Sequence, residues 1–197
     1  MAARTLRIAQ DKAADELLAN DPLALLTGML LDQQFPMERA FAGPHLMAER
    51  LGVDRLDAAQ LATYDPDKLT ALMTGPPAVH RFPGSMGERV QAMCRILVDE
   101  YDGDAAKLWT GVTDGAELRK RLEALPGFGA QKAKIFVALL AKQYGVKPKG
   151  WEQAAGDYAL DGFRSVADVT SAETLAKVRA HKQEMKAAAK ASQAARA

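Results

Sequence analysis

The sequence has one cysteine, Cys94, and only 6% aromatic residues. A single thiol excludes disulfides, cysteine-rich zinc sites and an iron–sulfur cluster held by several thiolates of one chain. No window approaches eighteen consecutive apolar residues, and the residues after Met1 lack the apolar stretch of a signal peptide. We therefore expect no membrane contact and a cytoplasmic location.

Strand signals are also scarce, because apolar and polar residues hardly alternate along the 197-residue chain. Apolar residues instead recur at steps of three and four, which is typical of helices with one buried face. The clearest stripes are Val90, Met93, Cys94, Leu97, Val98 and Tyr101 on a helix over 88–101, then Leu118, Leu122 and Leu125, then Ile135, Phe136, Leu139, Leu140 and Tyr144, and last Leu175, Val178 and Met185. The sequence predicts an all-α protein without an internal repeat, and its 48% hydrophobic content excludes disorder of the whole chain.

Helix boundaries have local signals of their own. Asp21-Pro22 predicts a helix cap followed by proline at the first helical position, and Thr170 with Glu173 has the spacing of a capping box. Glycine and proline together predict breaks, and these pairs fall at 43–44, 75–77, 83–84, 126–127 and 148–150.

The charges are segregated although the net charge is only +1. Residues 1–116 carry eleven basic and seventeen acidic side chains, whereas residues 117–197 carry fifteen basic and eight acidic ones. Either the second part faces a polyanion or its charge is a solvated basic tail. The tail contributes six of these charges, namely Lys177, Arg179, Lys182, Lys186, Lys190 and Arg196.

The sharpest local signal lies in residues 118–144, which are predicted to form a helix-hairpin-helix around Leu125-Pro126-Gly127-Phe128-Gly129. Gly127 and Gly129 allow a tight reversal with positive φ and a close approach of backbone to a ligand. The unpaired N–H groups at the start of the second helix then suit a phosphate. Such a phosphate would belong to a DNA backbone, and we expect the side chains that follow to contact the same backbone, namely Gln131, Lys132 and Lys134. The alternative is an ordinary turn between two packed helices.

The three histidines, His45, His80 and His181, are scattered and lack ligand spacing, so we expect no zinc and no catalytic metal. His80 begins the segment His80-Arg81-Phe82 after a glycine–proline break. Phe82 is either an apolar wedge inserted into DNA or a buried loop anchor.

With the hairpin, two further segments carry a resemblance. The run Asp21-Pro22 to Asp32-Gln33-Gln34-Phe35-Pro36 and the segment beginning Arg89-Val-Gln-Ala-Met-Cys94 are similar, in this order, to helix-hairpin-helix base-excision DNA glycosylases of the HhH-GPD superfamily, which includes endonuclease III. The resemblance covers roughly residues 21–144. It implies two helical lobes with an active-site cleft between them: residues 22–144, containing the hairpin at 118–144, and residues 1–21 plus 145–197, with the basic C-terminal tail.

The same resemblance implies DNA base-excision repair by a monomer that binds double-stranded DNA, flips a damaged or mispaired base and cleaves its N-glycosidic bond. It places Gln33 and Gln34 in the base pocket, and Gly127, Gly129, Gln131 and Lys132 on the phosphate. It also implies a monovalent sodium or potassium ion on the main-chain carbonyls of Glu123, Leu125 and Phe128. No other cofactor is expected.

The catalytic carboxylate departs from the family pattern. The family places an aspartate about twenty residues beyond the second hairpin glycine, and no aspartate stands there in this sequence. Glu152 is the leading candidate and Asp157 the second, although Glu152 in a first helical turn also simply favours the helix dipole. Asp32 is a third candidate if it faces the cleft rather than solvent. Trp151 either stacks on an extruded base or belongs to the core.

A second departure is Gln131, which stands where bifunctional family members carry the lysine of their lyase step, so a monofunctional enzyme is expected. Two alternatives remain beside the enzyme. One is a non-catalytic helix-hairpin-helix DNA-binding protein that lost the aspartate. The other is a small helical interaction protein whose hairpin is structural.

Overall fold

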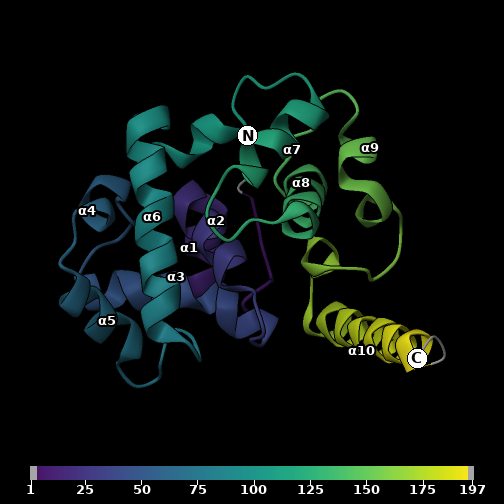
Figure 1. Cartoon of the computed structure of the whole chain (residues 1–197), viewed down its shortest axis with the longest axis horizontal. Coiled ribbons are helices and arrows are strands. Elements are labelled where there is room, and N and C mark those ends of the chain that lie inside the picture. The colour runs from purple at the N-terminus through teal and green to yellow at the C-terminus, as the bar shows by residue number, and fades with distance from the viewer. Residues whose placement is uncertain (1–3, 195–197) are drawn as a thin grey trace.

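The computed structural model describes residues 4–194, and these residues form helices and connecting turns without any strand (Figure 1). The predicted all-α class is confirmed. In chain order the elements are α1 Lys12–Asn20, α2 Pro22–Leu31, α3 Met37–Leu51, α4 Ala58–Ala62, α5 Pro66–Thr74, α6 Pro83–Tyr101, the 3₁₀ turn η1 Ala105–Leu108, α7 Gly115–Glu123, α8 Ala130–Gln143, α9 Trp151–Ala155, the 3₁₀ turns η2 Gly156–Ala159 and η3 Val166–Asp168, and α10 Ala172–Ala194. None of these helices is both long and apolar enough to cross a membrane.

The predicted helix start at Asp21-Pro22 is confirmed. The Asp21 carboxylate accepts hydrogen bonds from the N–H groups of Leu23 and Ala24 at 2.9 and 3.3 Å, and Pro22 is the first residue of α2. The start of α10 lies one residue later than predicted, because Ser171 rather than Thr170 is the cap. Its hydroxyl accepts from the Thr174 N–H at 3.1 Å.

Two predicted breaks are wrong. Gly43 and Pro44 lie inside α3, where both are buried. A Cβ on Gly43 would stand 2.8 Å from Leu31 Cδ1 and 3.1 Å from Val79 Cγ1, so this glycine serves the close approach of α3 to α2. Pro83 begins α6 instead of interrupting the chain, which agrees with the preference of proline for the first helical turn.

The helices form two groups of contacts, which Figure 1 shows as the purple-to-teal and the green-to-yellow parts of the chain. In the first, α2 packs on α3, α1 packs on both, and α4 and α5 pack on α6. In the second, α8 packs on α7, α9, η2 and η3, while α10 packs on η3. Arg4 joins the groups by donating to the carbonyls of Ala19 and Tyr144. The division into lobes of residues 22–144 and of both termini stays a prediction.

The apolar stripes are buried as expected in most positions. Leu175 and Val178 anchor the first turns of α10, but Met185 is 58% exposed, contrary to its predicted place in the stripe. Cys94 is fully buried in α6, where desolvation raises the pKa of its thiol to about 12.

Candidate functional site

The turn between α7 and α8 spans residues 124–129. Gly127 has φ +79°, as predicted, whereas Gly129 has φ −77° and ψ 172°, so only the first glycine needs its conformational freedom. A Cβ on Gly129 would meet no atom within 4 Å. This residue therefore lies against open space, and its lack of a side chain leaves the backbone accessible from outside.

The first turn of α8 has no side-chain cap. Gly129 stands at the N-cap position and cannot supply one, and the first backbone bond of the helix runs from the Ala133 N–H to the Gly129 carbonyl at 3.0 Å. The three preceding N–H groups, of Ala130, Gln131 and Lys132, donate to no acceptor among residues 4–194. Such groups, together with the positive end of the helix dipole, favour an anion.

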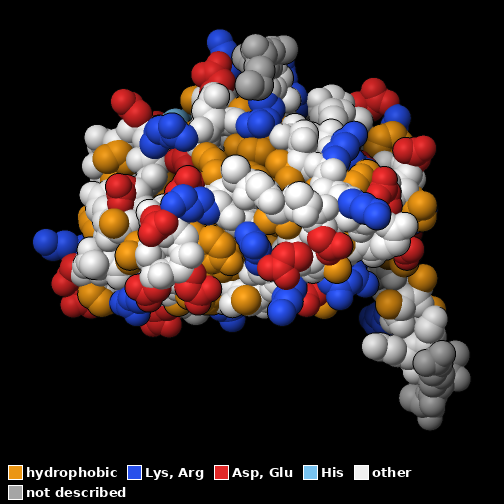
Figure 2. Space-filling view, turned by 90° about the horizontal axis from the view of Figure 1, so that it is seen from above, with side chains coloured by type: hydrophobic (Ala, Val, Ile, Leu, Met, Phe, Trp, Pro, Cys, Tyr) orange, Lys and Arg blue, Asp and Glu red, His pale blue; other side chains and the backbone are white. Residues whose placement is uncertain are grey.

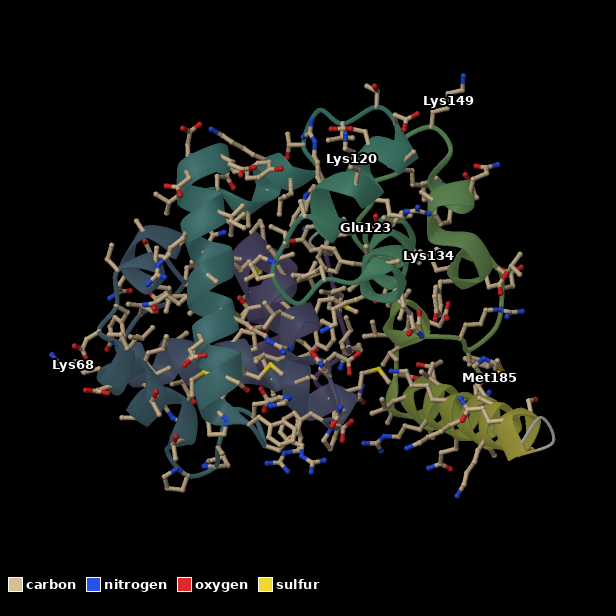
Figure 3. All side chains as sticks on the ribbon, in the orientation of Figure 1. Lys68, Lys120, Glu123, Lys134, Lys149 and Met185 are labelled. Carbon is tan, nitrogen blue, oxygen red and sulfur yellow. The ribbon has the colours of Figure 1, made fainter. Side chains whose placement is uncertain are left out.

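A groove with a volume of about 830 Å³ begins at this helix start. Four of its lining side chains are lysines or arginines, and Asp157 is its one acidic residue. It is lined by Ala130, Gln131, Lys134, Ile135, Gly156, Asp157, Tyr158, Arg164, His181, Lys182, Met185 and Lys186. Figure 3 labels Lys134 on α8 and Met185 on α10, the two helices that form its long walls. The groove is thus a cationic surface continuous with the uncapped helix end.

Gln131 is held in the groove wall. Its side-chain amide donates to the Tyr158 hydroxyl at 2.9 Å. Tyr158 belongs to η2, so this bond joins the start of α8 to the segment that follows α9. The predicted phosphate-binding residues Gln131 and Lys134 therefore share one surface.

Asp32 lies beside this groove. It follows α2 as its C-cap, its side chain is 11% exposed, and Lys182 Nζ lies 3.7 Å from its Oδ2. Lys182 itself lines the groove, and it reaches Asp32 from α10 across 150 positions of the chain. Asp32 therefore does not face solvent, and it contacts the groove through Lys182 rather than lining it.

Lys132 does not have the predicted orientation toward the exterior. Its ammonium group donates to the Leu30 carbonyl in the last turn of α2 at 2.8 Å. Burial lowers the pKa of Lys132 to about 8, with the Asp32 carboxylate opposing this shift and Arg89 adding to it. Consecutive residues of an α-helix lie about 100° apart around its axis, so the Lys132 side chain faces α2 while that of Gln131 faces the groove.

The segment 32–36 is fixed by its neighbours. Gln33 accepts a hydrogen bond at its side-chain oxygen from Arg89 at 2.9 Å. Buried His80 accepts from the Phe82 N–H at Nδ1, so its Nε2–H donates to the Gln33 carbonyl at 3.1 Å. Desolvation lowers the pKa of His80, which favours this neutral form. Gln34 is exposed with φ +53°.

Two aromatic rings, of Phe35 and Phe82, lie beside the His80 ring. Phe35 lies 4.6 Å from the His80 ring and carries the Arg39 guanidinium at 4.9 Å. Phe82 is 43% exposed and carries Arg81 at 4.7 Å, so it is not the buried loop anchor considered above. Aromatic rings beside guanidinium groups form a surface on which nucleobases stack.

The other two predicted carboxylates are exposed, unlike that of Asp32. Glu152 is exposed in the five-residue helix α9, and its carboxylate has no hydrogen-bond or ion-pair partner within residues 4–194. Asp157 is exposed at the groove wall. Trp151 is half-buried and packs against the hydrophobic core, which is the core alternative.

The carbonyls of the turn were predicted to bind a monovalent cation. The Leu125 carbonyl accepts from the Phe128 N–H at 3.1 Å. The carbonyls of Glu123 and Phe128 accept no hydrogen bond from the described part of the chain. These two carbonyls, one at the end of α7 and one in the turn, are of the type that a hard cation prefers. Among residues 4–194, no group of three or more His, Cys, Asp or Glu side chains is arranged to hold a metal ion.

Several residues of the groove were missed by sequence reasoning. Arg164 lies in an irregular segment and Tyr158 in the short 3₁₀ turn η2, and neither belongs to a motif, so no sequence signal marks them. Lys182 and Lys186 were counted only as tail charges, and the pairing of Lys182 with Asp32 depends on the path of the chain. No protein-family model, no curated protein and no solved structure matches this chain.

Proposed function

We propose that this protein binds duplex DNA through the start of α8 and the adjoining groove. The observation that carries the proposal is the uncapped N-terminus of α8 opening onto a groove with four Lys and Arg side chains and one carboxylate. Backbone N–H groups and cations of this kind contact phosphates without reading the base sequence. The resemblance of the hairpin to that of helix-hairpin-helix glycosylases supports the same ligand.

The chemistry that we propose is hydrolysis of an N-glycosidic bond, with Asp32 as the carboxylate. The bond between C1′ and the base breaks, water adds its oxygen to C1′, and the departing base takes a proton. Positive charge develops on the sugar in this step, and a carboxylate beside it stabilises the transition state. Asp32 is supported over Glu152 because it is nearly buried beside the groove, whereas Glu152 is exposed and unpartnered within residues 4–194.

A flipped base leaves a gap in the duplex that a side chain has to fill. Phe82 and Gln34 are both exposed. They lie beside the His80 ring and beside Gln33, which Arg89 holds through a hydrogen bond. We assign Phe82 the role of an apolar wedge and Gln34 a contact with the unpaired partner base. The carbonyls of Glu123 and Phe128 would hold a cation that bridges the turn to a phosphate.

A second candidate is a DNA-binding protein without catalysis. The observation in its favour is that the Asp32 carboxylate already pairs with Lys182. In that case the groove and hairpin bind DNA, and Asp32 serves only to hold α10.

One experiment distinguishes the two candidates. Purified protein is incubated with duplexes that contain uracil, alkylated purines, oxidised bases or adenine mismatches, and base release is measured. Asp32→Asn should keep DNA affinity within a few fold and lower the excision rate by at least about a hundredfold, because the amide lacks the negative charge.

Glu152→Gln is the matched control, and it should excise at nearly the wild-type rate. A large loss of excision rate in Glu152→Gln instead would identify Glu152 of α9 as the catalytic carboxylate. If the wild type binds duplex DNA but releases no base from any lesion, the non-catalytic candidate is the correct one.

A further inference from the structure

Helix α10 is anchored at one end only. Leu175 and Val178 are buried against the body, whereas every described side chain from Lys182 onward is exposed. Figure 2 shows the far end of α10 projecting from the molecule. At 1.5 Å per residue, a helix of 23 residues is roughly 35 Å long, so most of α10 stands clear of the core that holds its first turns.

One face of α10 is basic. Arg179, Lys182, Lys186 and Lys190 follow one another at steps of three and four, which places them in a row along the helix. Lys182 and Lys186 line the groove, so the row continues the cationic surface that begins at α8. Lys186 and Lys190 pair with no carboxylate within the described residues. Within residues 4–194 these two charges therefore have no role in holding the fold together.

The inner end of the same row is paired with carboxylates of the other helix group. Arg179 pairs with Glu38 in the first turn of α3, and Lys182 pairs with Asp32. Both cations remain substantially exposed, at 49% and 41%, and one oxygen of Glu38 is buried without a hydrogen-bond partner in the described structure. The carboxylates are largely buried, with exposed fractions of 20% for Glu38 and 11% for Asp32, so it is the cation of each pair that a DNA phosphate can reach from outside.

We infer that α10 is a DNA-binding arm whose inner cations exchange the carboxylates of Glu38 and Asp32 for DNA phosphates. The inference rests on the proposed function and deepens it: Lys186 and Lys190 contact the backbone first, and the exchange at Lys182 frees the Asp32 carboxylate for the substrate. Binding of DNA and exposure of the acid are then coupled. The free protein keeps Asp32 paired, which limits its reaction with anything other than bound DNA.

Duplex DNA fits this arm better than a lipid surface does. A helix that lies on a membrane needs an apolar face, and the exposed outer part of α10 offers only Met185 among large hydrophobic side chains. Phosphates spaced regularly along a strand suit a row of single cations without an apolar face.

The outer cations are tested by a salt titration of duplex affinity. Changing Lys186 and Lys190 together to alanine should make the slope of log affinity against log salt shallower by up to about two units, since each phosphate contact contributes about 0.9. The matched control replaces Lys12 and Lys68, which are exposed lysines of α1 and α5; Figure 3 places Lys68 far from α10. Equal slopes in the two double variants would overturn the inference.

The exchange is tested by removing the carboxylate that pairs with Arg179. Glu38→Gln should bind duplex DNA more tightly, by up to about fivefold, because Arg179 no longer has to leave a carboxylate. Glu16→Gln is the control, since it removes the same charge from an exposed pair on α1. Equal affinities of the two variants would refute the exchange.

Arg179→Ala supplies an independent measurement should Glu38→Gln fail to fold. It should lose less affinity than Lys186→Ala, because Arg179 gives up a carboxylate partner on binding and Lys186 does not. An equal or larger loss would contradict the exchange. If the wild type binds no duplex at low salt, the proposed function is refuted together with the arm. If the wild type binds and Gly129→Ala weakens the binding, but the variants of α10 do not, only the arm is refuted.

Discussion

Gly129→Ala separates DNA contact from folding more cleanly than any other substitution in the hairpin. The added Cβ meets no atom within 4 Å, and φ −77° with ψ 172° is open to alanine. Alanine is a poorer N-cap than glycine by about 1 kcal/mol, but it also reduces the entropy of the unfolded chain by about 0.4–1 kcal/mol. The free energy of unfolding should therefore change by less than about 1 kcal/mol.

The effect on DNA should be much larger. The new methyl group stands where a phosphate would approach the free N–H groups of Ala130 and Gln131. Loss of one charge-assisted hydrogen bond costs about 1.5–3 kcal/mol, which corresponds to a loss of about tenfold to a hundredfold in affinity. The salt slope should become shallower by about one unit if a phosphate contact is lost outright.

The assay is fluorescence anisotropy of a labelled duplex at several salt concentrations, with thermal melting followed by circular dichroism. Gly127→Ala and Gly52→Ala form a second pair, because both glycines have positive φ, +79° and +68°. Both should lose about 1–2 kcal/mol of stability, but only Gly127→Ala should weaken DNA binding. A Gly129→Ala protein that is folded and binds duplex DNA as the wild type does would refute the hairpin as a phosphate site.

Two further predictions concern Lys132 and the end of α10. Burial lowers the pKa of Lys132 to about 8 from 10.5, so the unfolded chain binds the extra proton between these values and stability rises with pH across that window. Relative to Lys132→Met, the free energy of unfolding of the wild type should rise by up to about 3 kcal/mol from pH 8 to 10.5 in denaturant titrations. If the free energies of the two proteins change in parallel with pH, the buried ammonium is contradicted. A chain ending at Lys186 should melt within about 2 °C of the full protein but bind duplex DNA several-fold more weakly, since the residues removed within the described part are exposed. A large drop in melting temperature would show that this end docks on the core.

Features set by local chemistry were predictable from the sequence. The all-α class follows from the period of the apolar residues, and the start of α2 follows from a carboxylate and a proline that satisfy the first turn. The left-handed Gly127 was also predictable, because few other residues adopt that conformation. Each of these depends on neighbours within a few positions of the chain.

Arg196, counted in the basic tail, lies outside the described residues.

Errors arose where distant segments decide the outcome. The Gly43-Pro44 pair has the local pattern of a break, but close packing of α3 on α2 keeps it helical. Met185 continues an apolar spacing, yet it lies in the wall of an open groove and is exposed. A periodic pattern shows which face of a helix is apolar, but it does not show whether anything covers that face.

The sequence by itself determined the helices, the turn between α7 and α8, and the set of charged residues available to a site. Only the tertiary structure decided which of those charges meet. It turned Lys132 inward to the end of α2, placed Lys182 beside Asp32, and left Glu152 in solvent. The physical reason is that backbone hydrogen bonds and turn conformations are fixed within a few residues, whereas the partner and burial of a charged side chain depend on segments more than a hundred positions away.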